Sequence, residues 1–422
     1  MATSILRRSG HMQGFCQVAN RLAWKPLAFP SEGFAVIPAD ERIEEETLPN
    51  YATSQYYPVT IGEIFRARYQ VVGKLGFGTT STVWLARDLS ERRHVALKLY
   101  IGSGSMVRSL DNEINAYKRI ENSSIKHPGR SAVRALLDSF HVDGPHGSHQ
   151  CLVHPPLWDS VFGFRHRNPM RRFPGQIMAL VLERLFQALD LLHQECHIAH
   201  TDIQESNMLL GTDESVLREF EQEELNNPCP RKELEGKTVY QSRELKQAKN
   251  FDALVLCDFG SAMHLDDGIA RREDIQPDVY RAPEVVLGIP WTSSVDIWNV
   301  GCMIWDCFQG GHLFTGHDPE LKTYRGRAHL AEMIALLGPP PPSVLARASF
   351  RSKFFSDRLI PVWISIPESR PLEQRESVLE GEDRDCFLRF MKKMLQWEPE
   401  KRSSAKELLE DEWILKHLDE GN

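Results

Sequence analysis

Apolar and polar residues change their spacing along the chain, from alternation near the amino terminus to helical repeats further on. Residues 68–100 alternate apolar with polar side chains and are rich in Val, Leu, Trp and Thr, which predicts three strands. Apolar residues recur at helical spacing over 106–120 and again over 176–194, which predicts two helices, the second of them long. Strands first and helices later indicate an α+β chain with two lobes.

Segments of biased composition interrupt and flank this pattern. Residues 211–250 hold 9 acidic and 7 basic side chains and two prolines, which predicts a solvated insertion that is dispensable for chemistry. Residues 1–60 are expected to form a largely disordered extension, and residues 416–422 a short tail. The lobes are therefore predicted to span residues 61–157 and 158–415, with the insertion inside the second lobe.

Composition narrows the class of protein. The 422 residues carry a formal net charge of -8, so the chain lacks the basic excess that direct nucleic-acid binding needs. The 8 cysteines form no CxxC pair and no zinc-ligand cluster, which suits a reducing compartment such as the cytoplasm or nucleus. No apolar run approaches the roughly 18 residues of a membrane span, so we expect a soluble monomer without a membrane partner.

The first residues leave one alternative open. Residues 1–31 contain no acidic side chain but four basic ones, a composition that also occurs in mitochondrial transit peptides. A disordered tail is the simpler interpretation, and mitochondrial targeting is the alternative.

Candidate chemistry begins between the first two predicted strands. The sequence LGFGTTSTVW at 75–84 places Gly76 and Gly78 where backbone N–H groups can approach phosphate oxygens. Taken alone, this loop is better explained as a glycine hairpin without a ligand. Lys98 ends a VALK motif on the next strand, where its side chain would point into the lobe and need a buried partner. Glu113, on the following predicted helix, is the candidate for that partner.

Three further motifs follow in order. HTDIQESN at 200–207 places Asp202 and Asn207 in a polar loop after the long predicted helix. CDFG at 257–260 follows a short apolar strand and supplies Asp258, a second ligand for a metal ion. APE at 282–284 closes the segment. Each motif alone fits an ordinary polar loop, but the ordered set is very improbable by chance.

With these motifs the chain resembles the eukaryotic protein kinases over residues 60–415. Asp296, in SVDIW at 294–298, resembles the aspartate that anchors the catalytic loop, and Arg402, in EPEKR, the arginine that pairs with Glu284. The sequence LGFGTTSTVWL at 75–85, the triplet His-Thr-Asp in place of His-Arg-Asp, and the insertion before Asp258 are similar to the SR-protein kinases, in particular the fungal members. The resemblance implies a two-lobed kinase fold, with a small antiparallel-sheet N-lobe plus one helix and a larger, mainly helical C-lobe.

The resemblance also implies an activity and its cofactors. The chain would be a serine/threonine protein kinase that uses ATP and Mg²⁺ to phosphorylate protein substrates. Arginine-serine-rich splicing factors are the substrates of the SR-protein kinases, which act in the regulation of mRNA splicing. Asp202 would align the acceptor hydroxyl, and Asn207 and Asp258 would hold Mg²⁺. Lys98, oriented by Glu113, would bind the α- and β-phosphates.

The nucleotide site implied by the resemblance spans the glycine-rich loop, the neighbouring strand and the connection between the lobes. His154 would be the gatekeeper, and the Pro155 carbonyl and Leu157 N–H would face adenine, because proline keeps its carbonyl although it lacks an N–H. The full set is Leu75, Gly76, Phe77, Gly78, Thr79, Thr80, Ser81, Thr82, Val83, Ala96, Lys98, His154, Pro155 and Leu157.

The sequence departs from the family pattern at the catalytic loop. Gln204 stands where most members have a lysine that neutralises the γ-phosphate, and the loss of one such group typically costs on the order of 10² to 10³ in rate. Gln204 is therefore assigned to the catalytic set with its effect on activity open. After Leu313, where relatives dock arginine-rich peptides on acidic side chains, the sequence has Arg325, Arg327 and Ala335, so an arginine-rich substrate also stays open.

A further departure concerns regulation. Thr201 replaces the arginine that receives an activation-loop phosphate, and residues 262–279 contain no Ser, Thr or Tyr. We therefore expect a constitutively active kinase, whose activation segment is ordered by neutral contacts of Gln276, Pro277 and Tyr280. A nucleotide-binding pseudokinase that acts as a scaffold is the main alternative, and a small-molecule phosphotransferase is a lesser one. The intact set of metal ligands and catalytic aspartate favours the kinase.

Overall fold

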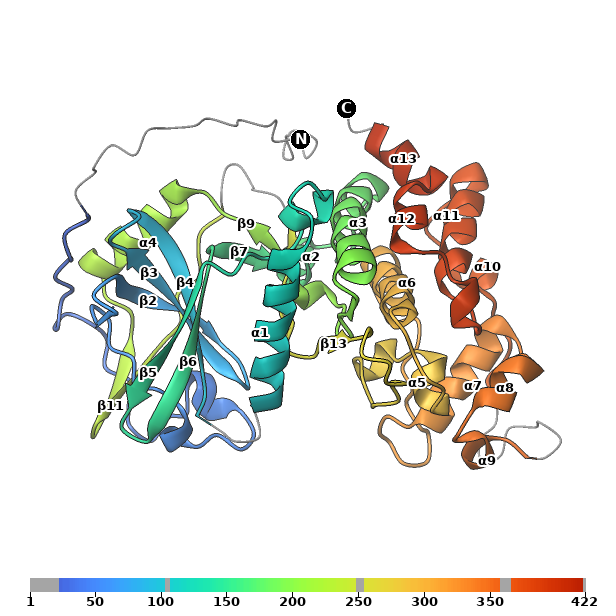
Figure 1. Ribbon diagram of the computed structural model, residues 1–422, viewed down its shortest axis with the longest axis horizontal. Helices are drawn as coiled ribbons and strands as arrows, with labels where there is room; N and C mark the ends of the chain where they lie inside the picture. Colours follow the sequence, from blue (N-terminus) through green and yellow to red (C-terminus); the bar gives the residue numbers. More distant parts are fainter. Residues whose placement is uncertain (1–22, 103–106, 248–253, 357–365, 420–422) are drawn as a thin grey trace. The chain divides into compact units, whose positions relative to one another are not determined.

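The structure, a computed structural model, describes residues 23–102, 107–247, 254–356 and 366–419 (Figure 1). The chain divides into two compact units. Unit 1 takes in Met1–Asp111, Arg134–Asp159 and Leu209–Ala253, and unit 2 takes in Asn112–Val133, Ser160–Met208 and Leu254–Asn422. The predicted α+β organisation in two lobes is confirmed, although three separate stretches of sequence build each unit.

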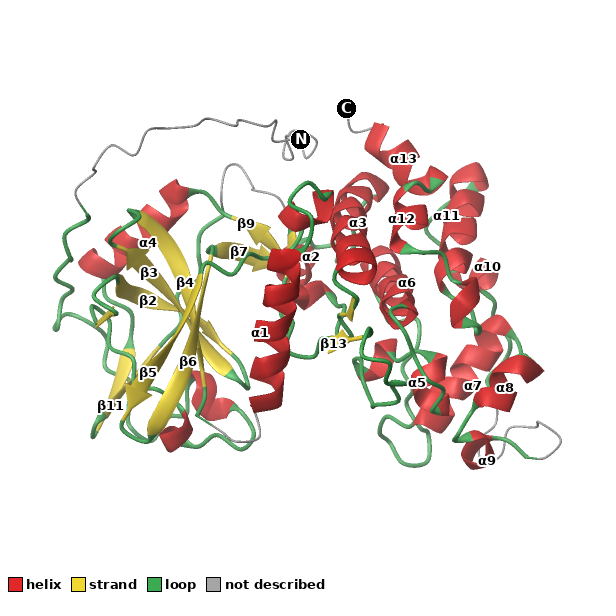
Figure 2. Cartoon of the chain, viewed as in Figure 1, coloured by secondary structure: helices red, strands yellow, loops and turns green. Residues whose placement is uncertain are grey.

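Unit 1 is built on a six-stranded antiparallel sheet, drawn in yellow in Figure 2. Its strand order is β1-β2-β3-β4-β6-β5. The strands are β1 Ile64–Phe65, β2 Tyr69–Phe77, β3 Ser81–Asp88, β4 Arg93–Tyr100, β5 Asp138–Gly144 and β6 Gly147–His154. β2, β3 and β4 are the three strands predicted from the alternation over 68–100. Their inward side chains, with Trp84 and Leu97 among them, form a buried core with Phe140 of β5.

The expected solvated insertion is wrong. Residues 211–250 form helix α4 Glu214–Asn226 and a hairpin of β10 Arg231–Leu234 and β11 Lys237–Tyr240, as far as they are described. The segment belongs to unit 1 and not to the second lobe. Phe220 of α4 lies in one buried cluster with Val72 of β2 and Leu85 of β3, so the apolar positions between the charges have a sheet to pack on.

The expected disorder of residues 1–60 is also wrong for the part that the structure describes. Gln70 of β2 exchanges two hydrogen bonds with the backbone of Leu27, at 2.9 and 2.7 Å. Buried Lys74 of the same strand pairs with Glu44 at 3.3 Å and with Glu45. Residues 23–60 therefore fasten onto the sheet through polar groups that hydrophobic patterning does not show. Residues 1–22, which carry most of the candidate targeting segment, lie outside the described residues.

Unit 2 is mainly helical. The two helices predicted from the sequence are both present, one of them wholly and one partly in this unit. α1 Val107–Asn122 begins in unit 1 and runs into unit 2, and α3 Gly175–Asp190 continues into a short π-helical turn, Leu191–Glu195. The further helices are α2 Val161–Arg167, α5 Pro283–Leu287, α6 Ser294–Gln309, α7 Gly326–Leu337, α8 Pro342–Arg347, α9 Arg351–Phe354, α10 Leu372–Arg375, α11 Gly381–Met394, α12 Ala405–Leu409 and α13 Glu412–Asp419. α13 replaces part of the expected tail.

Helix α6 is the centre of unit 2. It is buried from Val295 to Phe308, so its polar residues Asp296, Asn299 and Asp306 need partners inside the unit. Trp298 of α6 stacks on Phe314, and Phe308 stacks on Phe387 of α11. Over the described residues, no helix combines the length and apolar character that crossing a membrane requires. Short strands complete the chain: β7 Leu157–Ser160, β8 Ile198–Ala199, β9 Met208–Gly211, β12 Val255–Leu256 and β13 Met263–His264.

Candidate active site

The loop that follows β8 is held in place by hydrogen bonds to one buried carboxylate. Asp296 of α6 accepts hydrogen bonds from the backbone N–H groups of His200 and Thr201, both at 2.8 Å, and its Oδ2 lies 2.8 Å from Nε2 of His193. Thr201 has a φ of 66°, a left-handed conformation that a β-branched residue adopts only when its surroundings impose it. The anchoring role predicted for Asp296 is confirmed.

The carboxylate of Asp202 projects from this loop and is held at both oxygens. Nε2 of Gln204 donates to Oδ1 at 2.8 Å, and Nδ2 of Asn207 donates to Oδ2 at 2.8 Å and to the Asp202 carbonyl, also at 2.8 Å. Burial raises the pKa of Asp202, and the negative charge of Asp258 adds to this, while His200 and the two amides oppose it; the net shift is upward. The two amides therefore fix the direction in which this carboxylate points.

Asp258 lies close to Asn207 because the backbone of the preceding residue, Cys257, is hydrogen-bonded to Asn207. The N–H of Cys257 donates to the Asn207 carbonyl at 2.8 Å, and Asp258 follows with a left-handed φ of 63°. Phe259 is fully buried and packs against the rings of His200 and Tyr117, which fixes the strained residue before it. Asp258 itself is exposed.

These two side chains fit a magnesium ion. Because Nδ2 of Asn207 is used as a donor, its Oδ1 is left as an acceptor, and Mg²⁺ prefers such oxygen ligands together with the carboxylate of Asp258. No group of three or more His, Cys, Asp or Glu suited to a metal ion occurs in the described ranges. Mg²⁺ in nucleotide sites usually takes only one or two protein ligands and completes its shell with phosphate and water oxygens.

Unit 1 carries the predicted phosphate loop at the β2–β3 turn. Its N–H at Gly78 donates to the Ser81 carbonyl at 2.8 Å. Neither Gly76 nor Gly78 has a positive φ, and a Cβ at either position would meet no atom within 4 Å. The hairpin itself therefore does not need glycine at these two positions. This observation favours close approach of a ligand to the backbone over the plain hairpin.

Lys98 and Glu113 lie in different units. Lys98 is in the middle of β4, opposite Val83 and Leu152, and is 9% exposed; its Nζ lies 5.0 Å from the centre of the Tyr100 ring. Glu113 is on α1 in the part that belongs to unit 2 and is 1% exposed. Both side chains are buried, and a buried charge needs a partner, but their pairing with each other stays a prediction.

The predicted adenine-facing residues follow β6. His154 is fully buried and its Nδ1 lies 2.9 Å from the Ala135 carbonyl; burial and nearby Arg134 hold its pKa well below the ordinary value, so the ring is neutral. The Pro155 carbonyl accepts a long hydrogen bond, 3.4 Å, from Arg134, and Leu157 begins β7. The roles of these residues and of Ala96 toward adenine stay predictions.

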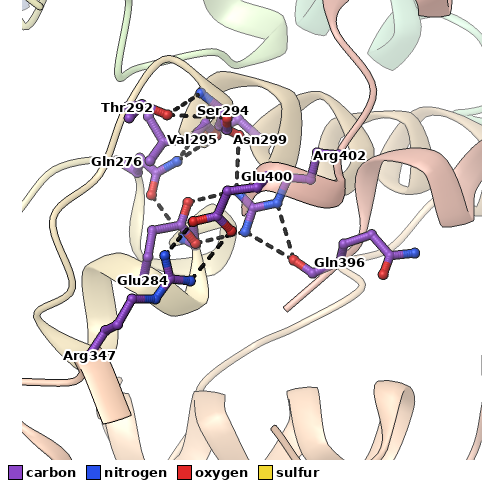
Figure 3. Close-up of polar contacts among 11 residues, drawn as sticks. Gln276, Glu284, Thr292, Ser294, Val295, Asn299, Arg347, Gln396, Glu400 and Arg402 are labelled. Carbon is purple, nitrogen blue, oxygen red and sulfur yellow. Dashed lines mark hydrogen bonds and ion pairs between the residues drawn. The ribbon is translucent and has the colours of Figure 1, made fainter. Parts of the chain in front are cut away.

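The end of the activation segment is fastened by uncharged groups and one buried ion pair (Figure 3). Nε2 of Gln276 donates to the Val295 carbonyl at 2.9 Å and to Asn299, and its Oε1 accepts from the N–H of Ala282 at 2.8 Å. Pro277 contributes its carbonyl, which accepts from the N–H of Tyr280 at 2.9 Å. The predicted neutral contacts are confirmed for Gln276 and Pro277, whereas the hydroxyl of Tyr280 donates to the carboxylate of Asp306.

The predicted pair of Glu284 and Arg402 is confirmed as well. Two parallel hydrogen bonds of 2.6 and 2.7 Å join the side chains, and both are completely buried. Arg402 also donates to the carbonyls of Ser294, at 2.9 Å, and Gln396, at 3.1 and 3.0 Å (Figure 3). The pair therefore fixes the start of α5 to the carboxyl-terminal part of unit 2.

A second buried carboxylate, not identified from the sequence, contacts the activation segment. Asp306 of α6 is buried and accepts from the Tyr280 hydroxyl at 2.6 Å, and its Oδ2 lies 2.6 Å from Nδ1 of His312. The hydrogen bond and charge of Asp306 raise the pKa of His312. Nearby, Glu205 of the catalytic loop forms a buried ion pair of 2.7 Å with Arg165 of α2. No local motif marks Asp306 or Arg165, because their partners are distant in sequence.

A family model for the protein kinase domain matches residues 69–414. The chain therefore belongs to the protein kinase family. A solved crystal structure of another kinase domain has the same fold, with a TM-score of 0.66 and 24% identity; the match covers 85% of this chain and 98% of the other.

Within that family the chain is a serine/threonine protein kinase, and it is similar to the SRPK kinases. A serine/threonine protein kinase of Aspergillus fumigatus is 41% identical over 394 residues, covering 91% of this chain and 94% of the relative. The serine/threonine-protein kinase SRPK of Physarum polycephalum is 29% identical over 401 residues, covering 88% and 91%. The predicted class of enzyme is confirmed, and nothing in these relatives supports the pseudokinase alternative.

Proposed function

We propose that this kinase transfers the γ-phosphoryl group of ATP, bound with Mg²⁺, to serine or threonine hydroxyls of protein substrates. One observation carries the proposal: Asp202 is held at both oxygens, next to two oxygen ligands for a metal, on a loop anchored by Asp296. Phosphoryl transfer demands positioning and charge neutralisation more than covalent chemistry from the protein. A rigid carboxylate beside a metal site meets that demand.

Each side chain then has a defined part. Asp202 accepts a hydrogen bond from the substrate hydroxyl and aligns its oxygen with the phosphorus atom. Asn207 and Asp258 would hold Mg²⁺, which supplies positive charge to the phosphate oxygens when it is bound. Lys98 binds the α- and β-phosphates, with Glu113 as its partner, and the backbone of Gly76 and the neighbouring loop residues approaches the phosphates.

Gln204 has a positioning part in this scheme. Its amide donates to Asp202 Oδ1 at 2.8 Å and carries no charge. It therefore reproduces the hydrogen bond that an ammonium group would make to the same carboxylate, but not the electrostatic stabilisation of the γ-phosphate. We infer a kinase that turns over more slowly than one with a lysine at this position.

Two observations bear on whether the substrates are proteins rich in arginine and serine. The likeness to an SRPK supports proteins rich in arginine and serine as the first class to examine. The acidic side chains near α7 are already engaged, however. Asp318 and Glu320 bind Arg327, and Glu332 accepts from the backbone of Thr315 and Gly316 at 2.7 and 3.0 Å. Of these three residues only Glu320, whose side chain is 73% exposed, offers a carboxylate that an arginine-rich peptide could readily reach.

We also propose that the kinase works in a reducing compartment, the cytoplasm or the nucleus. The seven cysteines of the described residues are all free and all buried, which is what a chain folded under reducing conditions shows.

Phosphotransfer to a peptide panel tests the proposed reaction. Purified protein with Mg-ATP should label an arginine-serine peptide, casein or a basic protein, and Asp258→Asn should abolish metal-dependent turnover while the thermal unfolding midpoint is retained. Asp278→Asn, on an exposed side chain of the same segment, is the matched control and should keep activity. Wild-type rates in single variants of Asp202, Lys98 and Asp258 would overturn the assignment.

A further inference from the structure

A buried histidine joins the insertion to the sheet of unit 1. His94 is the second residue of β4, and its side chain is 1% exposed. Nδ1 lies 3.0 Å from Oε1 of Glu214 and Nε2 lies 3.1 Å from Oε2 of Glu221, both on α4. Ionised carboxylates can only accept hydrogen bonds, so the ring satisfies both of them only as an imidazolium with two N–H groups.

Cations share the same two carboxylates. Arg87 of β3, the register partner of His94, lies 3.0 Å from Glu221, and Arg218 of α4 lies 3.4 Å from Glu214. From the amino-terminal segment the uncharged Trp24 faces the ring edge-on, with the ring centres 5.6 Å apart. Burial lowers the pKa of His94, but the hydrogen bonds and charges of the two glutamates outweigh it, so the pKa lies above the ordinary 6.5.

The other face of α4 reaches the strand that leads into the glycine-rich loop. A Cβ built on Gly73 of β2 would lie 2.9 Å from Cε1 of Phe220, so the ring packs directly on the backbone of this strand. The N–H of Arg243 donates to the Lys74 carbonyl at 2.9 Å. Leu75, the first residue of the loop, packs against the same cluster as Phe220. The insertion therefore holds β2 at the three residues that precede Gly76.

We propose that His94 is a positioning residue for nucleotide binding: its imidazolium fastens α4 to the sheet, and α4 in turn sets the position of β2 and of the glycine-rich loop. This inference rests on the proposed function of that loop. The direction of the pH dependence follows from the protonation state of His94. We call the contact of the His94 imidazolium with Glu214 and Glu221 the clamp. It is complete at low pH, where the free imidazole would also be protonated, and it is lost as pH rises through the raised pKa of His94.

Nuclear magnetic resonance and hydrogen exchange test the clamp without nucleotide. The His94 ring should titrate above pH 6.5, and the backbone amides of α4 should exchange faster once the ring is neutral. Glu214→Gln removes one carboxylate, so the ring should titrate lower by about one pH unit. A neutral His94 ring at pH 6, or an unchanged midpoint in Glu214→Gln, overturns the proposal.

Steady-state kinetics test the consequence for ATP. KM for ATP should rise at least about threefold between pH 6.5 and 9, because a charge-assisted bond is lost, while kcat follows the same profile in all variants. His94→Gln should abolish the pH dependence of KM and leave it at the high-pH value. His141→Gln, which removes an exposed histidine of β5, is the matched control and should keep the wild-type profile.

The two readouts separate the two proposals. If His94 titrates above pH 6.5 as expected but the protein shows no ATP turnover, the proposed function is rejected and the clamp stands. Turnover with a KM profile that is the same in wild type, His94→Gln and Glu214→Gln would reject the clamp and leave the kinase intact. Since Glu214 is 41% exposed, its variant keeps the test decisive if His94→Gln fails to fold.

Discussion

At the scale of single residues, Gln204 decides how the catalytic carboxylate is held. Its amide and that of Asn207 occupy one oxygen each of Asp202, so the side chain cannot rotate without the loss of a hydrogen bond. A neutral donor keeps this geometry while the positive charge is absent. The resemblance to kinases identified the position, and the structure shows that the amide contacts Oδ1 of Asp202.

Gln204→Lys should raise kcat several-fold and leave KM for the peptide unchanged. An ammonium group can make the same contact with Asp202 and also opposes the charge that develops on the transferred group. Gln204→Leu, of similar size but without a donor, should lower kcat by about tenfold or more. Steady-state kinetics with saturating Mg-ATP measure both. An unchanged kcat in Gln204→Lys would mean that another residue already supplies the charge.

At the scale of elements, helix α4 illustrates how far charge patterning misleads. The sequence shows mixed charge and two prolines, which are typical of a solvated insertion. In the structure Glu214 and Glu221 pair with His94 and Arg87 of the sheet, and its apolar stripe covers Val72 and Leu85. A sparse stripe of three or four apolar residues is sufficient when a complementary surface exists, and sequence alone cannot show that surface.

Phe220→Ala should lower the free energy of unfolding of unit 1 by about 3 kcal/mol, since it empties the buried contact with Gly73. Chemical denaturation monitored by circular dichroism measures the change. Glu219→Gln, at the preceding residue and on the exposed face of α4, should change stability by less than about 0.5 kcal/mol.

Gly73→Ala provides a complementary test. The new methyl group would meet the Phe220 ring at 2.9 Å, so the single variant should be destabilised by about 1 to 3 kcal/mol. Combining Gly73→Ala with Phe220→Ala should cost clearly less than the sum of the two separate losses, because the cavity accepts the methyl group. Additive losses would show that α4 does not pack on β2.

At the scale of the whole chain, long-range polar contacts hold the activation segment in place. The ion pair of Glu284 and Arg402 joins residues 118 positions apart. Arg402→Met should cost about 3 to 5 kcal/mol, because Glu284 would remain buried and unpaired. The nearby pair of Arg347 and Glu400 is exposed, so Arg347→Ala should cost less than about 1 kcal/mol (Figure 3). Thermal unfolding distinguishes the two.

The same contacts predict activity without phosphorylation. The hydroxyl of Thr201 donates to the Ser261 carbonyl at 2.7 Å, and Gln276 and Tyr280 bind groups of α6, so no phosphate is needed to order the segment. Protein from bacteria, shown by mass spectrometry to be free of phosphate, should be fully active. Gln276→Ala should lower kcat about tenfold or more without changing KM for ATP. An absolute requirement for an upstream kinase would contradict this model.

The sequence by itself determined the two-lobed α+β fold, the three strands β2 to β4, the two long helices and the order of the motifs. These depend on spacing within a short window, which the chain carries locally. The anchoring of the catalytic loop by Asp296 and the pairing of Glu284 with Arg402 followed only through resemblance to kinases. Tertiary structure alone decided that residues 23–60 and 211–247 pack on the sheet of unit 1 and that Asp306 supports Tyr280. Those outcomes depend on buried pairs such as Lys74 with Glu45 and His94 with Glu221, whose partners lie far apart in sequence and meet only when the chain is folded.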